Sequence, residues 1–407
     1  MRGWSVQKRP QGSFSPSRKG HDRQGSVGML APSLERKVTN MKRFLAGVAT
    51  VVMLAGWMGA VAPAAEPKPA AKEAPAEAEP SQPAFEKPGP APAATGFAFK
   101  DTAGQYLDVY LDGRAVARYM YASDTSTPEK AHETYKPYLH VLNAEGTAPI
   151  TKGPGGQFTH HRGIFFGWQR IGFDGKKYNL WEMKGGNRQV HLKFLAQTAE
   201  ADRATFTSQV AWNLADGKTI IEESRTFTFH RRPAPALALI DFSATVKAVA
   251  GDLTLDGDPE HGGVQYRPAD EVDRKATEYC LPKDAVEPPL DPNAEFQVMA
   301  ATKDGKTAAI TKIAKTDLPW AAESYVLDGK TYYVQEMSHP DNPKDTLWSA
   351  YRDYGRFGAF PKAELKNGET LTVRYRFWVS AGPAPSREEL QKQWDAYAKA
   401  PAAGAAQ

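Results

Sequence analysis

The sequence predicts an all-β fold, a large antiparallel β-sandwich that is followed by a C-terminal helix. Polar and apolar side chains alternate in runs such as residues 226–229 and 371–377, which is typical of strands with one buried face. A capping box near the end of the chain indicates the helix. Tight hairpin turns require positive φ angles, which Asp-Gly and Asn-Gly pairs accept. Such pairs stand at 112–113, 174–175, 216–217, 256–257, 304–305, 328–329 and 367–368.

Near the start of the 407-residue chain, a short segment has the pattern of an export signal. Two basic residues at 42–43 precede an uncharged apolar run over residues 44–62, and an Ala-Pro-Ala cleavage site follows at 62–64. This order predicts a secretory signal peptide over residues 41–65, and an uncleaved membrane anchor is the alternative. The expected location of the mature protein is therefore periplasmic or extracellular.

Residues 1–40 precede this signal peptide and show no periodic apolar pattern. We expect a mis-annotated start, with Met41 as the first residue, or a disordered extension. The segment holds eight Lys or Arg and two Asp or Glu, whereas the whole chain has a net charge of +4, so the part from Met41 onward carries −2. A net charge of −2 lacks the basic surface that nucleic-acid-binding proteins need, so the sequence excludes this class. The single cysteine, Cys280, excludes an internal disulfide and a cysteine-based zinc cluster.

A proline-rich linker separates the signal peptide from the predicted fold. Residues 66–95 hold eight prolines among Ala, Glu and Lys, a composition that favours extended conformations. The β-sandwich is expected over residues 96–382. No later run is long and apolar enough to span a bilayer, so we expect no membrane span in the mature chain.

The C-terminal helix is expected over residues 383–400, before a disordered tail over residues 401–407. Ser386 is placed to cap the helix, and Glu389 completes a capping box. Three apolar side chains then share one helical face, so that the helix can pack on the sheets. They are Leu390, Trp394 and Tyr397.

One stretch with unusual polar residues lies at 159–163, Thr-His-His-Arg-Gly. Neighbouring residues on a strand point to opposite faces, so only one of His160 and His161 could enter a site unless the backbone is irregular there. Glu182, which follows a tryptophan, is a candidate acidic partner.

Two further polar stretches lie at residues 258–267 and 336–343. In the first, a pair of glycines permits close backbone approach, and Gln265 and Arg267 alternate with apolar residues so that both face one side. In the second, two prolines bracket a turn that would hold His339 in place. Purely structural roles, such as turns and buried struts, are the alternative for each stretch.

Aromatic residues near these polar groups suit a sugar, whose ring has an apolar face. We therefore expect a carbohydrate ligand, which the protein binds or processes without a required cofactor. In a mutarotase-like reaction, His261 or His161 would act as the acid and Glu336 or Glu182 as the base, with His339 also a catalytic candidate. The substrate-binding candidates are His160, Arg162, Trp168, Gln265, Arg267, Trp348, Arg352 and Asp353.

Two alternatives remain open. A divalent metal, zinc or iron, could be held by His161, His261 and His339 with Glu182 or Glu336, although no H-x-x-x-H spacing supports it. The protein could also be a non-catalytic glycan-binding module presented on the proline-rich linker.

The same polar stretches resemble a known family. Exported bacterial proteins that carry the label "PmoA family" or "methane oxygenase PmoA", a domain of unknown function, are similar at residues 136–138, 160–163, 260–267, 339–343 and 352–355. The resemblance implies a β-supersandwich like that of galactose-mutarotase-like domains. The chain departs from the family at residues 157–159, Gln-Phe-Thr, where relatives often carry Asp-His-Pro. A methane oxygenase subunit spans the membrane several times, and the hydropathy of this chain excludes that activity.

Overall fold

The computed structural model describes residues 81–93, 95–257, 261–273, 275–282, 285, 316–351 and 354–399. The predicted signal peptide, the extension before it and the tail lie outside these described residues. Two substrate-binding candidates, Arg352 and Asp353, lie outside them as well.

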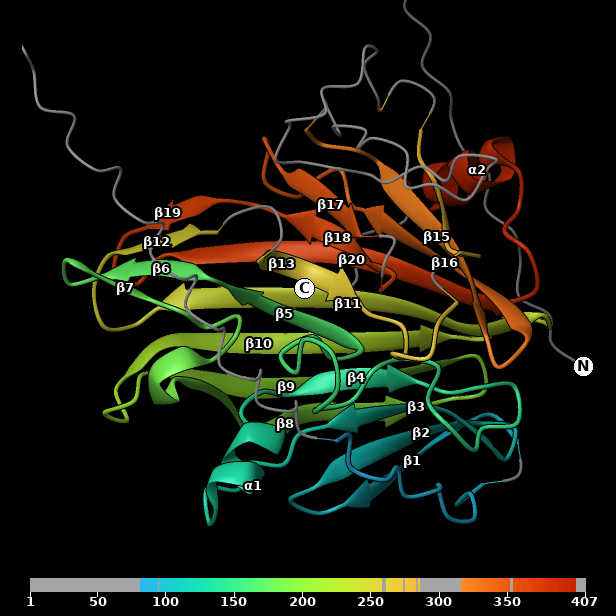
Figure 1. Cartoon of the computed structure of the whole chain (residues 1–407), viewed down its shortest axis with the longest axis horizontal. Coiled ribbons are helices and arrows are strands. Elements are labelled where there is room, and N and C mark those ends of the chain that lie inside the picture. The colour runs from blue at the N-terminus through green and yellow to red at the C-terminus, as the bar shows by residue number, and fades with distance from the viewer. Residues whose placement is uncertain are drawn as a thin grey trace, which may run out of the picture. The chain divides into compact units, whose positions relative to one another are not determined.

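Two eight-stranded antiparallel sheets form a sandwich, which confirms the predicted fold class (Figure 1). The first sheet runs in the order β1 (Phe97–Thr102), β2 (Tyr106–Leu111), β3 (Arg114–Met120), β4 (Tyr138–Val141), β5 (Ile164–Trp168), β13 (Gly262–Tyr266), β18 (Arg356–Phe360) and β17 (Leu347–Tyr351). The second runs in the order β14 (Glu278–Cys280), β15 (Trp320–Leu327), β16 (Lys330–Ser338), β20 (Thr370–Ala381), β11 (Ala236–Ala248), β10 (Thr219–His230), β9 (Arg203–Asn213) and β8 (Arg188–Ala199).

A small third sheet and three short helical elements complete the described residues. The small sheet contains β19 (Ala363–Leu365), β12 (Leu253–Asp256), β6 (Arg170–Phe173) and β7 (Lys176–Tyr178). The helical elements are α1 (Pro128–Glu133), the 3-10 turn η1 (Lys184–Gly186) and α2 (Arg387–Ala398). None of the helices within the described ranges is long and apolar enough to cross a membrane.

The main hydrophobic core lies between the two large sheets. Phe166 of β5 points inward, and its ring centroid is 5.7 Å from that of Phe242 on β11. Phe165, the preceding residue, points to the opposite side and packs against Tyr138 and Trp181. Strands β5 and β13 are buried along their whole length, because loops cover the outer face of the first sheet at these strands. This outer face is where the candidate site is built.

The C-terminal helix α2 packs on the second sheet, close to β15 and β16 (Figure 1). Both halves of the predicted capping box form, since Ser386 accepts from the Glu389 N–H and the Glu389 side chain accepts from the Ser386 N–H. Leu390 is fully buried, and the Trp394 indole donates to the Ser338 carbonyl at 2.8 Å. The helix therefore acts as a strut on the sheet, as its apolar face indicates.

Residues 81–93, which the sequence places in the linker, run along the outer face of the first sheet. The Arg118 guanidinium of β3 lies 4.6 Å from the Phe85 ring and donates to the Glu86 carbonyl at 2.8 Å. The Tyr110 hydroxyl donates to the Gly89 carbonyl at 2.8 Å. A proline-rich extended segment has few backbone bonds of its own, so side chains of the sheet supply its partners.

Candidate functional site

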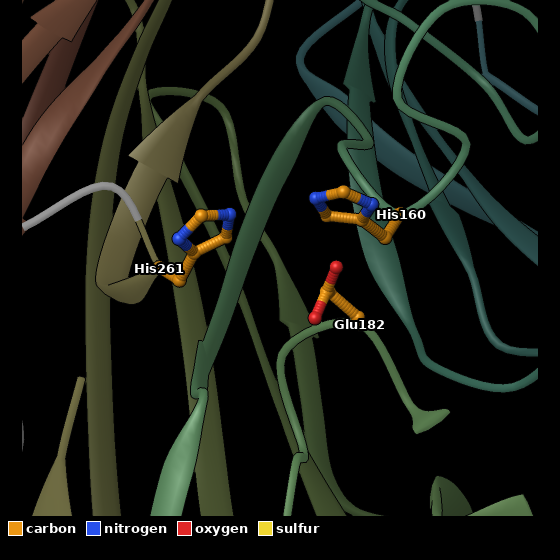
Figure 2. Close-up of side chains that lie close together, drawn as sticks. All are labelled: His160, Glu182 and His261. Atoms are coloured by element: carbon orange, nitrogen blue, oxygen red, sulfur yellow. The ribbon is translucent and has the colours of Figure 1, made fainter. Parts of the chain in front are cut away.

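Three side chains from separate loops converge on the outer face of the first sheet (Figure 2). His160 precedes β5, Glu182 follows β7, and His261 lies directly before β13. Their nearest nitrogen and oxygen atoms all lie within 4.8 Å of one another, and all three residues are partly buried. We call these three residues the His/Glu cluster.

The two neighbouring histidines lie in an irregular turn rather than on a strand. The turn is closed by the His161 N–H, which donates to the Phe158 carbonyl at 2.8 Å, and Phe158 has a φ of 53°. At Gly163, where φ is 47°, a Cβ would come within 2.1 Å of the Leu139 carbonyl oxygen. This backbone brings both imidazoles to one side of the sheet, with His160 and His161 ring centroids 4.3 Å apart.

Arg162 anchors this turn to α1. Its guanidinium donates to the carbonyls of Glu133 at 2.8 Å and His132 at 2.6 Å, at the C-terminal end of the helix. It also lies 4.0 Å from the Tyr135 ring centre. The fully buried side chain therefore positions the residues before it.

The loop that carries Glu182 is shaped by Asn179. The Asn179 side-chain oxygen accepts from the Glu182 N–H at 2.8 Å, while its amide nitrogen donates to the Glu182 carboxylate at 2.6 Å. Lys184 contacts the other carboxylate oxygen at 2.9 Å. The loop lies directly on β5, because a Cβ at Gly167 would come within 2.4 Å of the Leu180 carbonyl oxygen. Sequence reasoning missed Asn179, although an Asn shortly before an acidic residue is a typical Asx-turn signal.

His261 is held at the junction of two strands. Its carbonyl accepts from the Gln169 N–H at 3.1 Å, just beyond β5. At Gly263, with a φ of 73°, a Cβ would overlap the Ala359 carbonyl oxygen of β18 at 2.0 Å. The pair of glycines after His261 therefore allows the close backbone approach that the sequence indicates.

Burial controls the protonation of the histidines. It lowers the pKa of His160 to about 2, with the nearby charge of Lys136 as the next cause. Burial also lowers the pKa of His161 well below its usual value. Within the described part of the chain, the His160 Nε2 atom and both ring nitrogens of His161 have no hydrogen-bond partner. At neutral pH these imidazoles are uncharged, so their lone pairs are available to a ligand.

Aromatic rings surround the cluster. The Tyr354 ring is stacked on His161 at 5.7 Å and lies 4.7 Å from the Phe158 ring. On the other side, Trp181 packs on Phe165 at 4.6 Å. Phe158 is 36% exposed, which is unusual for a phenylalanine beside a polar cluster.

Lys136, like Asn179, lies near the cluster but was not predicted as a site residue from the sequence. The residue is 2% exposed, and its ammonium donates to the Trp181 carbonyl at 2.6 Å and lies 4.5 Å from the Phe165 ring centre. Burial, together with Arg162, lowers its pKa well below the usual value. Lys136 belongs to residues 136–138, one of the segments similar to the known family. A single lysine carries no pattern in the sequence that would indicate its burial.

Two of the other predicted residues, Gln265 and Arg267, lie in a polar patch near the same sheet, together with Arg356. Arg356 donates to the Gln265 side chain at 2.5 Å and to Ser349 at 3.2 Å. Arg267 binds the Asp270 carboxylate and the Tyr354 carbonyl. Gln265 and Arg267 are fully buried in these bonds.

Four predicted residues lie away from the cluster. Trp168 and Trp348 belong to the core between the sheets, and Glu336 is buried there with its carboxylate 3.4 Å from the Ala359 N–H. His339 lies against α2, 5.4 Å from the Tyr397 ring. The predicted set of metal ligands is therefore corrected in two places. His160, rather than His161, lies with His261 and Glu182, and His339 lies at the second sheet, away from them.

The chain belongs to a family of unknown function, DUF6807, whose model matches residues 106–395. The expected domain of unknown function is thus confirmed, whereas the match carries no methane-oxygenase label. No curated protein sequence matches the chain.

Solved structures with a similar arrangement share little sequence with the chain. A heparan sulfate lyase from Pedobacter heparinus is 10% identical with a TM-score of 0.33, and the match covers 71% of this chain and 38% of the lyase. The chain thus spans about two fifths of the lyase. A galactose mutarotase-like protein from Lactobacillus casei is 9% identical, with 70% and 100% covered and a TM-score of 0.31. A putative aldose 1-epimerase from Escherichia coli is 11% identical, with 70% and 100% covered and a TM-score of 0.27.

Proposed function

We propose that this protein binds a carbohydrate at a divalent-metal centre formed by His160, Glu182 and His261. The observation that carries the proposal is the convergence of two imidazoles and one carboxylate, from three loops, within 4.8 Å. Two nitrogens and one oxygen form a ligand set that suits zinc or iron and leaves coordination positions open.

The geometry of the His/Glu cluster fits a metal ion after a small adjustment. Ligand atoms that share an ion at about 2.1 Å lie roughly 3–4 Å apart. The present separations of up to 4.8 Å therefore require the side chains to close by about 1 Å. Asn179 orients the Glu182 carboxylate, as residues behind metal ligands commonly do. A bound metal would polarise a substrate oxygen or activate a water molecule.

The aromatic surroundings support a carbohydrate as the ligand. Phe158 is exposed beside the cluster, with its ring centroid 6.3 Å from that of His160. Its backbone φ of 53° is uncommon for a bulky residue, and such strain is often found at ligand sites. A pyranose ring has an apolar face that stacks on an aromatic ring, while its hydroxyls can reach the metal and the polar groups.

Metal analysis of the purified full-length protein tests the proposal. After reconstitution with zinc, manganese or iron and removal of excess metal, we expect about one ion per chain. His160→Ala and His261→Ala should each lose most of this metal. His191→Gln, which changes a histidine on β8, serves as the control and should keep it. Less than about a tenth of an ion per chain in the wild type would contradict the proposal.

A second measurement addresses the carbohydrate. Mono- and oligosaccharides at millimolar concentration should raise the melting temperature of the metal-loaded protein. No shift with any sugar would contradict the carbohydrate part. Turnover of a bound glycan that persists in a chelator would favour metal-free acid–base catalysis by His261 and Glu182.

We also propose that the domain acts outside the cytoplasm. The support is the signal-peptide pattern of residues 41–65. Expression of the full chain in a bacterium should yield a product in the periplasm or medium that begins near residue 65. A cytoplasmic product that retains residues 41–65 would contradict this.

A further inference from the structure

A cavity of about 290 Å³ lies on the outer face of the first sheet. Strands β2, β3 and β4 line it, and residues 82–86, the end of α1 and the loop after β4 complete its wall. Its volume is near the lower end of small-ligand sites, which hold about 300–1,000 Å³. None of its lining residues belongs to the His/Glu cluster. The cavity therefore has room for one small molecule, apart from the proposed metal centre.

Two polar atoms of the cavity wall have no hydrogen-bond partner among the described residues. His140 is 3% exposed, and Thr151 contacts its Nδ1 atom at 3.0 Å, so that Nε2 is left without a partner. The Gln82 amide nitrogen donates to Asp270 at 2.9 Å, while its Oε1 atom accepts no hydrogen bond. A Cβ at Gly153 would lie 3.7 Å from both of these atoms. The missing side chain of Gly153 therefore leaves space beside two groups that a ligand can bind.

Hydroxyl groups of a ligand fit these two atoms. A hydroxyl both donates and accepts, so it pairs with the Nε2 atom of neutral His140 whichever ring nitrogen carries the proton, and a second hydroxyl can donate to Gln82. Aromatic rings lie beside them, since the His140 ring centroid is 5.7 Å from that of Phe85 and 5.0 Å from that of Tyr138. Hydroxyl partners next to aromatic rings are the surroundings that a sugar needs.

The ionised side chains of the cavity wall are largely paired. Arg118 pairs with Asp108 at 2.6 Å, and Lys130 pairs with Glu133 at 3.0 Å. Each of these cations therefore already has its counter-charge, and neither calls for an anionic ligand.

Two further ionisable groups line the cavity, Lys136 and Glu86. Burial lowers the pKa of Lys136 well below its usual value, which disfavours its charged form. Glu86 is exposed, so water solvates its carboxylate. A charged ligand would lose its own solvation in the cavity without gaining a buried counter-charge, whereas a neutral ligand avoids this cost.

We propose that the cavity is a second ligand site, which binds one neutral sugar unit without a metal ion between the first sheet and residues 82–86. The site goes beyond the proposed function, because it uses none of the three metal ligands.

Calorimetric titration of the full-length protein in a chelator tests the site, with glucose, galactose, mannose and N-acetylglucosamine as probes. At least one of these sugars should bind in the millimolar range, and glucuronate should bind more weakly than glucose. Gly153→Ala should weaken binding of the sugar by about tenfold or more, because the new methyl group fills the space beside His140 and Gln82. The control Gly89→Ala should keep the affinity, since its Cβ meets only the end of the Lys100 side chain.

Protection of residues 82–86 gives a second measurement, which needs no variant. Among the described residues, 81–93 make no backbone–backbone hydrogen bond, so a bound sugar should add to the contacts that hold this segment. Saturating sugar should therefore slow cleavage after the exposed Glu86 by a glutamate-specific protease.

Four results would overturn the inference. They are no binding of any of the four neutral sugars in chelator, an unchanged affinity in Gly153→Ala, tighter binding of glucuronate than of glucose, and cleavage after Glu86 that bound sugar does not slow. A protein that binds no zinc would overturn the metal centre alone, because every measurement on the cavity is made on the metal-free protein.

Discussion

Gly167→Ala should weaken metal binding although residue 167 is not a ligand. The new Cβ would lie 2.4 Å from the Leu180 carbonyl oxygen, whereas ordinary contacts of this kind begin near 3.4 Å. The loop must therefore move by about 1 Å from β5, which would stretch the 3.1 Å bond from the Leu180 N–H to the Trp168 carbonyl beyond hydrogen-bond distance. Glu182, two residues further on, would move with the loop.

Two effects of different size follow from this displacement. Overpacking and the lost bond should lower the free energy of unfolding by about 1–3 kcal/mol. The side chains of the cluster must already close by about 1 Å to share a metal ion, so a further displacement of Glu182 by about 1 Å should weaken metal affinity by roughly 10- to 100-fold, as loss of an orienting partner does. Competition with a chromogenic chelator measures the affinity, and thermal melting measures the stability.

Gly217→Ala is the matched control for lost stability. Gly217 has a φ of 87° and no atom within 4 Å of the added Cβ, so the substitution strains a turn without displacing a neighbour. It should cost about 1 kcal/mol and leave metal affinity unchanged. Wild-type metal affinity in Gly167→Ala would refute the argument that β5 positions the Glu182 loop.

Three further predictions concern orientation, stacking and pH. Asn179→Ala should weaken metal affinity by about 10- to 100-fold in the same competition assay, and an unchanged affinity would show that Glu182 needs no orienting partner. Phe158→Ala should weaken sugar binding by roughly 0.5–1.5 kcal/mol in calorimetry at unchanged metal affinity, and equal sugar binding would argue against stacking. Burial lowers the pKa of His140 to about 3, so its neutral form stabilises the fold above pH 6.5 and this contribution is lost as the pH falls towards 3. In chemical unfolding between pH 6.5 and 4, His140→Gln should remove a slope of about 1.4 kcal/mol per pH unit, and identical slopes would contradict the assignment.

Local patterns in the sequence were sufficient to predict the fold class. Strands with one buried face, such as β10 and β20, alternate between buried and less buried residues over 221–227 and 373–379, and the capping box at Ser386 marks the start of α2. The order of the strands in the sheets could not be predicted from the sequence, because β13 pairs with β5 and β18, which are far from it along the chain. Such pairing depends on contacts that no short window of sequence contains.

The sequence predicted the residues of the candidate site but not how they group, because the grouping also depends on contacts between distant parts of the chain. His160, His261 and Glu182 were all named, but their grouping depends on three loops that meet only in the folded chain. Alternation did not distinguish inner from outer residues on β5 and β13, since these strands are buried on both faces. Trp168 was therefore indistinguishable from a ligand-facing tryptophan until the sheets were placed.

Anomalous scattering at the zinc absorption edge, from crystals of the zinc-loaded protein, tests the metal centre most directly. We expect one strong peak within about 2.3 Å of a nitrogen of His160, a nitrogen of His261 and an oxygen of Glu182. No peak at this position, or a peak bound only by other residues, would contradict it.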